Sequence, residues 1–413
     1  MRLNTMAWRT LSRNRRRTLI TSLSVAFGIF LAVTFTGSGD YSYTSMINTS
    51  TVMGLGHVSV AEEGNNARPS LARWLRDADS LRIATSGLPE VSGAYPRIMG
   101  QAMFAAGAKS AGGMFMGIDP ALETPQHNFF LRSVVDGALF AEAAGRGALI
   151  GAEMAEKLNL RPGRKMVITV TDKDGELTSE LLRISGVFQT GDHAADSGIV
   201  LVPLDRLRQT LGYGPGGVTL LAVYTDDLRR VKKIQADLTE KLSPTGRLEV
   251  LTWRETQADL AGLIAVDRLF NNLLQLLVGL VIAAGIMNTM LMSVLERNRE
   301  FGIMLAVGMS PAQVARLVLV ESFWLGCLGL ALGIMLTAPW FYYMSRTGID
   351  LSALVGEDYS AGGVLVDPVL KLRLFRESAL AILGTVFVLT LAAGVYPAIR
   401  AGRVPPARSI KEV

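Results

Sequence analysis

Four uncharged apolar stretches, each long enough to cross a lipid bilayer, constrain this chain more than any other feature. A spanning helix needs about 20 apolar residues at a rise of about 1.5 Å per residue. The stretches are Thr18–Gly39, Leu273–Leu295, Ser322–Ser345 and Ser378–Ile399. One span, a long polar segment and then three spans with short connections predict a membrane protein that carries a large domain between its first two spanning helices.

Composition and charge agree with a membrane location. Of the 413 residues, 49% are apolar, which is too many for an ordinary cytosolic enzyme. The net charge is +5, but the basic residues gather beside the apolar stretches, as in the positive-inside pattern. No nucleic-acid recognition motif accompanies them, so we expect no nucleic-acid partner. The clustered residues are Arg9, Arg13, Arg15, Arg16, Arg17, Arg297, Arg299, Arg400, Arg403, Arg408 and Lys411.

These clusters predict the orientation of the chain in a membrane. Both termini and the loop Glu296–Arg316 are expected in the cytoplasm, which leaves residues 41–265 and the loop 347–376 outside. The first apolar stretch is longer than the core of a signal peptide and no Ala-x-Ala site follows it, so we interpret it as a retained anchor. Cys327 falls inside the third span, and the outer domain can therefore form no internal disulfide.

The expected organisation is a membrane protein with four transmembrane α-helices, one plus three, and a large mixed α/β periplasmic domain inserted between helices 1 and 2. Its segments are a cytoplasmic interfacial helix at 1–17, spanning helix 1 at 18–40, the inserted two-lobed domain at 41–262, a stalk and spanning helix 2 at 263–295, a cytoplasmic connection at 296–313, spanning helix 3 at 314–346, an outer loop at 347–376, spanning helix 4 at 377–400 and a cytoplasmic tail at 401–413.

Strand and helix patterns alternate in the second half of the inserted domain. Period-2 or continuous apolar runs of strand length occur at 167–170, 181–188, 199–202 and 220–224. Helical patterns occur at 153–158, 204–211 and 227–242. The Gly- and Ala-rich segment 57–147 lacks such regularity, and we expect it to form the second lobe.

Catalytic signatures are missing from the sequence. No G-x-x-x-x-G-K-[ST] loop is present, so the chain has no phosphate-binding loop of this kind for ATP. His57, His127 and His193 lack metal-ligand spacing, and polar surface or loop positions explain them best. Glu321 lies near the start of an apolar span, where an ionisable group is a candidate functional site. Because Arg316 is about one turn away, an interfacial position or a structural partner is the commoner explanation for Glu321.

The connection after the second span has the pattern of a short amphipathic helix, charged at its start and followed by the helix-start signal Ser310-Pro311. Such a helix suits docking into a groove of a cytoplasmic partner, whereas periodicity alone favours an ordinary interfacial connector. Within the third span, Gly329 and Gly333 form a small-xxx-small face suited to close helix packing.

This connection resembles the coupling helix of the MacB/FtsX/LolC–LolE family of ABC-transporter permeases, which carries an E-R-x-x-E-[FI]-G-I-x-x-A-x-G signature. The tail Tyr396–Ala401 with Pro405-Pro406, and the segments Gly117–Pro120 and Leu160–Gly163, are similar to other parts of that family. The residues that match or flank the signature, and that the resemblance assigns to ATPase coupling, are Glu296, Arg297, Arg299, Glu300, Phe301, Gly302, Ile303, Ala306 and Gly308.

The resemblance implies a non-enzymatic permease subunit in the bacterial inner membrane. Its implied partners are a second permease subunit, identical or homologous, two cytoplasmic ATPase subunits that bind ATP and Mg, and a periplasmic carrier or adaptor. No cofactor is expected in this chain. ATP-driven closure of the ATPases is transmitted through the helices to the outer domain, an arrangement called mechanotransmission. The chain begins almost at the interfacial helix, without the ATPase domain fused ahead of the first span in MacB, and so resembles LolC, LolE and FtsX more.

Three functions remain open at this point. Lipoprotein release of the LolC–LolE kind comes first, since Gly56-His57-Val58-Ser59-Val60 is similar to a short motif of that branch. A MacB-type efflux permease comes second. An FtsX-like regulator of cell-wall hydrolases comes third, because the outer domain in that branch is usually smaller. The sequence leaves the substrate and the identity of the second permease open.

Overall fold

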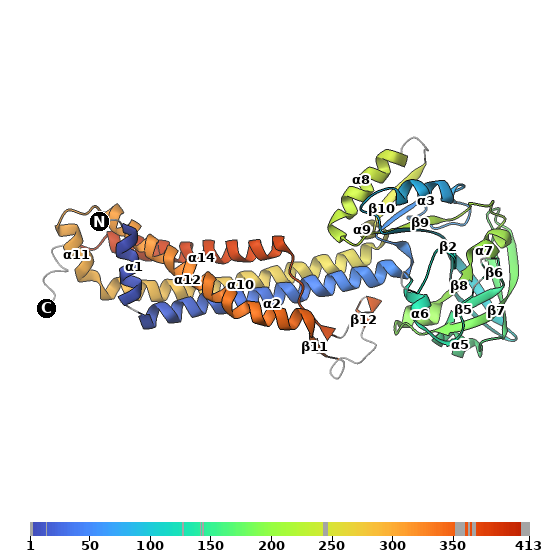
Figure 1. The fold of residues 1–413 in the computed structure, drawn as a ribbon, viewed down its shortest axis with the longest axis horizontal. Coiled ribbons are helices and arrows are strands. Elements are labelled where there is room, and N and C mark those ends of the chain that lie inside the picture. The colour runs from blue at the N-terminus through green and yellow to red at the C-terminus, as the bar shows by residue number, and fades with distance from the viewer. Residues whose placement is uncertain are drawn as a thin grey trace. The chain divides into compact units, whose positions relative to one another are not determined.

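A computed structural model describes residues 3–13, 15–125, 128–140, 142, 144–242, 247–351, 360–361, 364–365 and 369–405. The chain divides into two compact units. A helical unit comprises residues 1–42, 265–350 and 369–413, and an α/β unit comprises residues 43–264 and 351–368. Figure 1 shows the elements of both units along the chain. His127 and the tail beyond Pro405 lie outside the described residues.

Among the residues that the structure describes, the helical unit contains four helices that are long and apolar enough to cross a membrane. The shortest of them has 27 residues, or about 40 Å at 1.5 Å per residue, which exceeds the roughly 30 Å of a bilayer's apolar core. The expectation of one plus three spanning helices is confirmed. The helices are α1 (Leu3–Arg13), α2 (Arg15–Ser50), α10 (Ala258–Glu296), α11 (Asn298–Ala306), α12 (Pro311–Arg346) and α14 (Arg376–Gly402).

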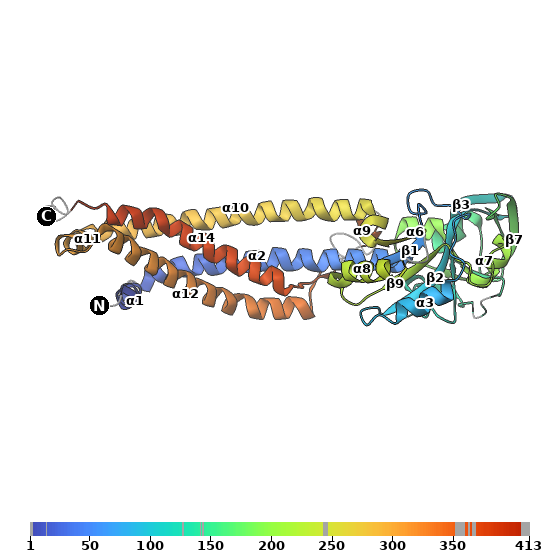
Figure 2. The same cartoon turned by 90° about the horizontal axis from the view of Figure 1, so that it is seen from above.

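Small residues on α12 allow it to approach α2 closely, and Figure 2 shows these helices from a second direction. A Cβ added to Gly329 would lie 2.6 Å from the Val25 Cβ, and one added to Gly333 would lie 2.5 Å from the Ile29 Cδ1. On the other side of α12, Phe323 meets Phe387 of α14 edge to face, with ring centroids 5.6 Å apart. Without a hydrophobic force between helices inside a membrane, such close packing supplies much of the attraction.

We predict that Gly329→Ala destabilises the helical unit. The added methyl group meets the branched Val25 side chain, whose Cβ cannot move without moving α2, and overpacking of this kind costs about 1–3 kcal/mol. Gly285→Ala on α10 is the matched control, because no atom outside its own helix lies within 4 Å of its added Cβ. Thermal unfolding of the purified chain in detergent measures both. Equal melting temperatures for the two variants would contradict the packing account.

The α/β unit is built on one ten-stranded sheet with the strand order β10-β1-β9-β2-β3-β8-β5-β7-β4, in which β6 pairs with β2 and β7. Neighbours are antiparallel except for the parallel pairs β3 with β8 and β5 with β7. The strands are β1 (Val58–Glu62), β2 (Gly93–Ala106), β3 (Lys109–Ile118), β4 (Val134–Gly137), β5 (Gly147–Gly151), β6 (Lys165–Thr171), β7 (Leu177–Phe188), β8 (Ile199–Pro203), β9 (Leu220–Tyr224) and β10 (Leu248–Thr252).

Helices α3 (Ala78–Ser86), α4 (Phe129–Arg132), α5 (Ala152–Leu158), α6 (His193–Gly198), α7 (Leu204–Leu211), α8 (Val231–Leu242) and α9 (Trp253–Thr256) accompany the sheet. Short strands β11 (Ile349–Asp350) and β14 (Val369–Leu370) pair in the helical unit, and β12 (Ser360–Ala361) pairs with β13 (Val364–Leu365). The four strands and three helices expected in the second half of the domain are confirmed.

The expectation that segment 57–147 forms a lobe of its own was wrong. It supplies β1, β2 and β3 to the same sheet as the later strands. Strand β2 pairs with β9 over Gly93–Arg97 and with β3 over Ile98–Ala106, so one long strand continues across both halves of the sheet. Glycine hid this pattern: a Cβ at Gly113 of β3 would lie 2.6 Å from the Gly198 oxygen, so the strand needs a residue without a side chain there.

The end of α2 is held to the sheet by buried polar groups. A wider turn, η1 (Thr51–Leu55), follows the helix, and Gly54 within it has φ +152°. Arg97 of β2 donates from Nη1 to the Gly54 carbonyl at 2.6 Å, and its Nη2 pairs with Glu123 at 2.6 Å. Both side chains of this ion pair are buried. Tyr224 donates its hydroxyl to the Thr51 carbonyl at 3.1 Å. We call this set of contacts the α2 joint.

His57 belongs to the α2 joint. It lies in the turn between η1 and β1, as a loop position predicts, but its side chain is buried and not at the surface. Its Nδ1 accepts the Thr225 N–H at 3.2 Å, so Nε2 carries the proton, 3.3 Å from the Thr51 hydroxyl. Burial lowers the pKa of His57 from 6.5 to about 4. His193 is exposed, as expected, and its ring lies 2.5 Å from a Glu153 carboxylate oxygen.

We predict that His57 makes the stability of the chain fall as pH falls between about 6.5 and about 4. In that window the side chain is protonated in the unfolded chain but neutral in the folded chain. The free energy of unfolding is therefore highest above pH 6.5 and decreases by up to about 1.4 kcal/mol per pH unit below it. His57→Gln should flatten the melting temperature against pH, and His193→Gln is the exposed control. An unchanged slope in His57→Gln would contradict the assignment.

Candidate functional site

The candidate site is the end of the helical unit where α11 connects α10 to α12. The turn at Arg297 interrupts the helix between α10 and α11. After α11, Gly308 adopts φ +103°, a conformation that a side chain would strain. Ser310 then caps α12: its Oγ accepts the Gln313 N–H at 3.3 Å, and the Gln313 side chain accepts the Ser310 N–H at 2.8 Å. Two firm boundaries therefore define a nine-residue helix.

A buried ion pair fixes this short helix to the bundle. Arg297 donates from Nη1 to both carboxylate oxygens of Glu321, at 3.0 and 3.2 Å, and its Nε donates to Glu300 at 2.8 Å. Arg297 and Glu321 expose only 8% and 4% of their side chains. The guanidinium also lies 5.0 Å from the centroid of the buried Phe301 ring. Glu321 thus has a structural partner, and the partner is Arg297 rather than the exposed Arg316.

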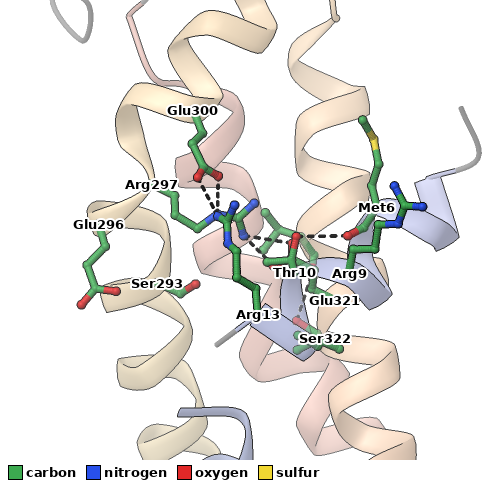
Figure 3. A network of polar contacts seen from close by, with 12 residues as sticks. Met6, Arg9, Thr10, Arg13, Ser293, Glu296, Arg297, Glu300, Glu321 and Ser322 are labelled. Atoms are coloured by element: carbon green, nitrogen blue, oxygen red, sulfur yellow. Dashed lines mark hydrogen bonds and ion pairs between the residues drawn. The ribbon is translucent and has the colours of Figure 1, made fainter. Parts of the chain in front are cut away.

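Arginines from the N-terminal helices extend the network, as Figure 3 shows for Arg13, Arg297, Glu300 and Glu321. Arg13 of α1 pairs with Glu300 at 2.7 Å. Arg17 of α2 pairs with Glu296 at 3.0 Å and donates to the Ser293 hydroxyl at 2.5 Å. Partial burial would raise the pKa of Glu300, but the hydrogen bonds from Arg297 and Arg13 outweigh burial and lower it. Glu300 is therefore ionised near neutral pH.

The signature residues divide into two groups with different surroundings. Arg297, Phe301 and Gly302 are buried against the bundle, and Glu296 and Glu300 make ion pairs within the chain. The opposite side of α11 is exposed and mainly apolar, with Ile303 46% and Val307 82% exposed. We call this exposed surface the α11 outer face, which consists of Arg299, Ile303, Ala306, Val307 and Gly308.

A groove of about 370 Å³ lies between α1 and α11. Arg9, Arg13, Arg297 and Glu300 give it a charged side, while Met304 and Leu317 give it an apolar one. The sequence predicted a short helix at α11 and, by resemblance, a docking role for it, but gave no signal that α1 borders the same groove. A helix that approaches from far along the chain leaves no periodicity in the segment it covers.

We predict that Glu321→Gln destabilises the bundle by about 3–5 kcal/mol, because it leaves the Arg297 guanidinium buried without its counter-charge. The double variant Arg297→Gln/Glu321→Gln should be less damaging than the sum of the two single variants, since it leaves no unpaired charge. Arg13→Gln removes an exposed partner and should cost less than about 1 kcal/mol. Melting temperatures in detergent compare the four proteins, and strict additivity in the double variant would contradict a buried pair.

Comparison with known families decides what kind of protein this is. A model of the FtsX-like permease C-terminal domain matches residues 272–406, and a model of the MacB-like periplasmic core domain matches residues 18–241. The chain belongs to the MacB/FtsX/LolC–LolE family of ABC-transporter permeases. The resemblance seen in the sequence is thereby confirmed. Helix α11 lies within the matched C-terminal domain.

Curated relatives of this permease include proteins of two kinds. The lipoprotein-releasing system transmembrane protein LolC of Xylella fastidiosa is 23% identical and aligns over 78% of each chain. LolE of Haemophilus influenzae is 22% identical over 94% of this chain and 92% of its own length. The pyoverdine export ATP-binding/permease protein PvdT of Pseudomonas putida is 25% identical over 98% of this chain, which spans 58% of that protein.

Among solved structures, the periplasmic region of MacB from Actinobacillus actinomycetemcomitans is 13% identical, with a TM-score of 0.37, over 52% of this chain and 97% of that one.

Among the described residues of the permease, no group of three or more His, Cys, Asp or Glu side chains could hold a metal ion.

Proposed function

We propose that this permease docks a separate cytoplasmic ATPase on the α11 outer face and uses the motion of that ATPase to extract lipoproteins from the inner membrane. The division of α11 carries the proposal. One side is fixed by the Arg297–Glu321 pair, and the other presents Ile303 and Val307 to solvent at the end of a bundle of spanning helices. An apolar helix face with a basic side chain, Arg299, suits a groove with acidic borders on the partner.

The mechanism follows from the continuity of two helices. Helix α2 runs unbroken from Arg15 to Ser50 before the α2 joint, and α10 runs from Ala258 to Glu296 immediately before α11. A continuous helix passes a displacement along its length because each turn is hydrogen-bonded to the next. Movement of the docked α11 would therefore reach residue 258 through α10, and the inserted domain would move in response. The basic clusters beside the spans support a cytoplasmic α11 and a periplasmic inserted domain.

Lipoprotein release comes first among the candidates for the work that this motion performs, because the relatives LolC and LolE are named as transmembrane proteins of a lipoprotein-releasing system. The motif Gly56–Val60 does not discriminate between the two functions, because its residues have structural roles: His57 belongs to the α2 joint, and Val58, Ser59 and Val60 belong to β1. Gly56 has φ +74°, and a Cβ there would lie 2.8 Å from the Val223 nitrogen. Export of a soluble substrate, as the name of PvdT indicates for that protein, is the second candidate.

We predict that Val307→Asp weakens association with the ATPase and leaves the stability of the permease unchanged. Val307 is 82% exposed, so a charge there meets only the partner, and a mismatched charge in an interface can cost several kcal/mol. Leu177→Asp is the matched control, since Leu177 is 77% exposed on β7 of the other unit. Co-purification of each variant with the co-expressed ATPase is the measurement.

Glu300→Lys provides a contrast to Val307→Asp. It places a third cation beside Arg297 and Arg13, so it should lower both the melting temperature and ATPase association. ATP hydrolysis should require the ATPase, because the permease has no phosphate-binding loop. If Val307→Asp co-purifies with the ATPase as well as Leu177→Asp does, α11 is an ordinary connector and the docking proposal fails.

A release assay separates the two candidate functions. Proteoliposomes that contain the permease, its ATPase and a triacylated lipoprotein should transfer the lipoprotein to a soluble acceptor when ATP is added. Pyoverdine enclosed on the side of the inserted domain should not be depleted. The opposite pattern would replace lipoprotein release by efflux.

A further inference from the structure

A second groove lies on the helical unit, away from the α11 outer face. Its volume is about 310 Å³, and α1, α2 and α12 each supply part of its wall. The wall is apolar where Leu11, Leu19, Leu328 and Leu332 line it. None of these residues belongs to the coupling signature, and neither the docking proposal nor the release mechanism uses them.

Two polar groups distinguish this groove from a plain lipid-facing surface. Arg15 lines it from the first turn of α2, and its Nε donates to the Ser12 carbonyl at 3.3 Å. Among the described residues, Arg15 makes no ion pair, unlike Arg13 and Arg17, which pair with Glu300 and Glu296. Ser22 also lines the groove, and its side-chain oxygen is buried without a hydrogen-bond partner among the described atoms.

We infer that this groove binds one anionic phospholipid from the leaflet at the α1 end of the bundle. An acyl chain suits a wall of leucine side chains in a membrane-spanning unit. A phosphate group suits the guanidinium of Arg15, which offers two further nitrogens for a bidentate contact. An ester oxygen of the lipid would accept the hydrogen bond that the Ser22 hydroxyl does not make inside the protein. A zwitterionic lipid fits the same wall, but its headgroup also carries a cation that the unpaired Arg15 repels.

Trp8 lines the groove and provides a direct reporter. In bilayers made mainly of phosphatidylcholine, a small fraction of brominated phosphatidylglycerol should quench the fluorescence of Trp8 more than the same fraction of brominated phosphatidylcholine. Subtracting the signal of Trp8→Phe isolates this side chain from the other tryptophans. One basic side chain near a membrane surface predicts a preference for the anionic lipid of about fivefold in apparent affinity.

Matched variants test the two parts of the groove. Arg15→Gln should remove the headgroup preference, whereas Arg16→Gln should keep it, because Arg16 is exposed outside the groove. Leu332→Phe should reduce quenching by both lipids, while Leu336→Phe, one turn further along α12 and outside the groove, should not. Melting temperatures confirm that each variant folds.

Two outcomes would overturn the inference. Equal quenching by the two brominated lipids in the wild-type protein would mean that Trp8 contacts only bulk lipid. Loss of the phosphatidylglycerol preference on addition of inorganic phosphate, at constant ionic strength, would mean that Arg15 takes a free anion instead of a phospholipid. Neither outcome depends on an ATPase or on transport, so the proposed function stands or fails separately.

Discussion

The buried pair between Arg297 and Glu321 is the interaction on which the arrangement of α11 against the bundle depends. Charges removed from water are costly unless each meets its partner with good geometry, and here one guanidinium contacts two carboxylates and an aromatic ring. The pair joins the start of α11 to the third turn of α12. The short helix therefore cannot rotate without separating the two charges of the pair. A helix of nine residues has little stability of its own in water. Its orientation is therefore set by this contact and by the packing of Phe301.

The buried network also divides the signature residues into a supporting group and an exposed group. Signature residues inside the network hold α11 in place, and those on the α11 outer face are available to a partner. Arg13 and Arg17 bring α1 and α2 into the network. The surface that an ATPase would meet therefore combines the N-terminal helices with the connection between α10 and α12. A force applied to α11 can reach α2 through these ion pairs, and it can reach α10 through the backbone.

Much of the architecture could be predicted from the sequence, because membrane spans and amphipathic elements leave strong local patterns. The four spans, the strands β6 to β9 and the Ser310 cap were all identifiable in this way. The Gly- and Ala-rich β2 and β3 were not, since their small residues serve close contacts and hide the alternation of a strand. The burial of His57 and the partner of Glu321 were missed for another reason: the contacting groups come from the end of β9 and from the turn between α10 and α11, and no local pattern encodes such long-range pairing.

Transmission through α10 is the central claim of this account, and a break inside that helix tests it most directly. Leu263→Pro removes a backbone hydrogen bond and costs about 3 kcal/mol in local helix stability. Asp259→Ser, in the first turn of α10, is the control that keeps the helix intact. The account predicts that the Leu263→Pro permease assembles with its ATPase and hydrolyses ATP but no longer releases lipoprotein from proteoliposomes, while Asp259→Ser works nearly as the wild type does. Normal release by Leu263→Pro, or equal damage from Asp259→Ser, would contradict the claim that α10 carries the motion.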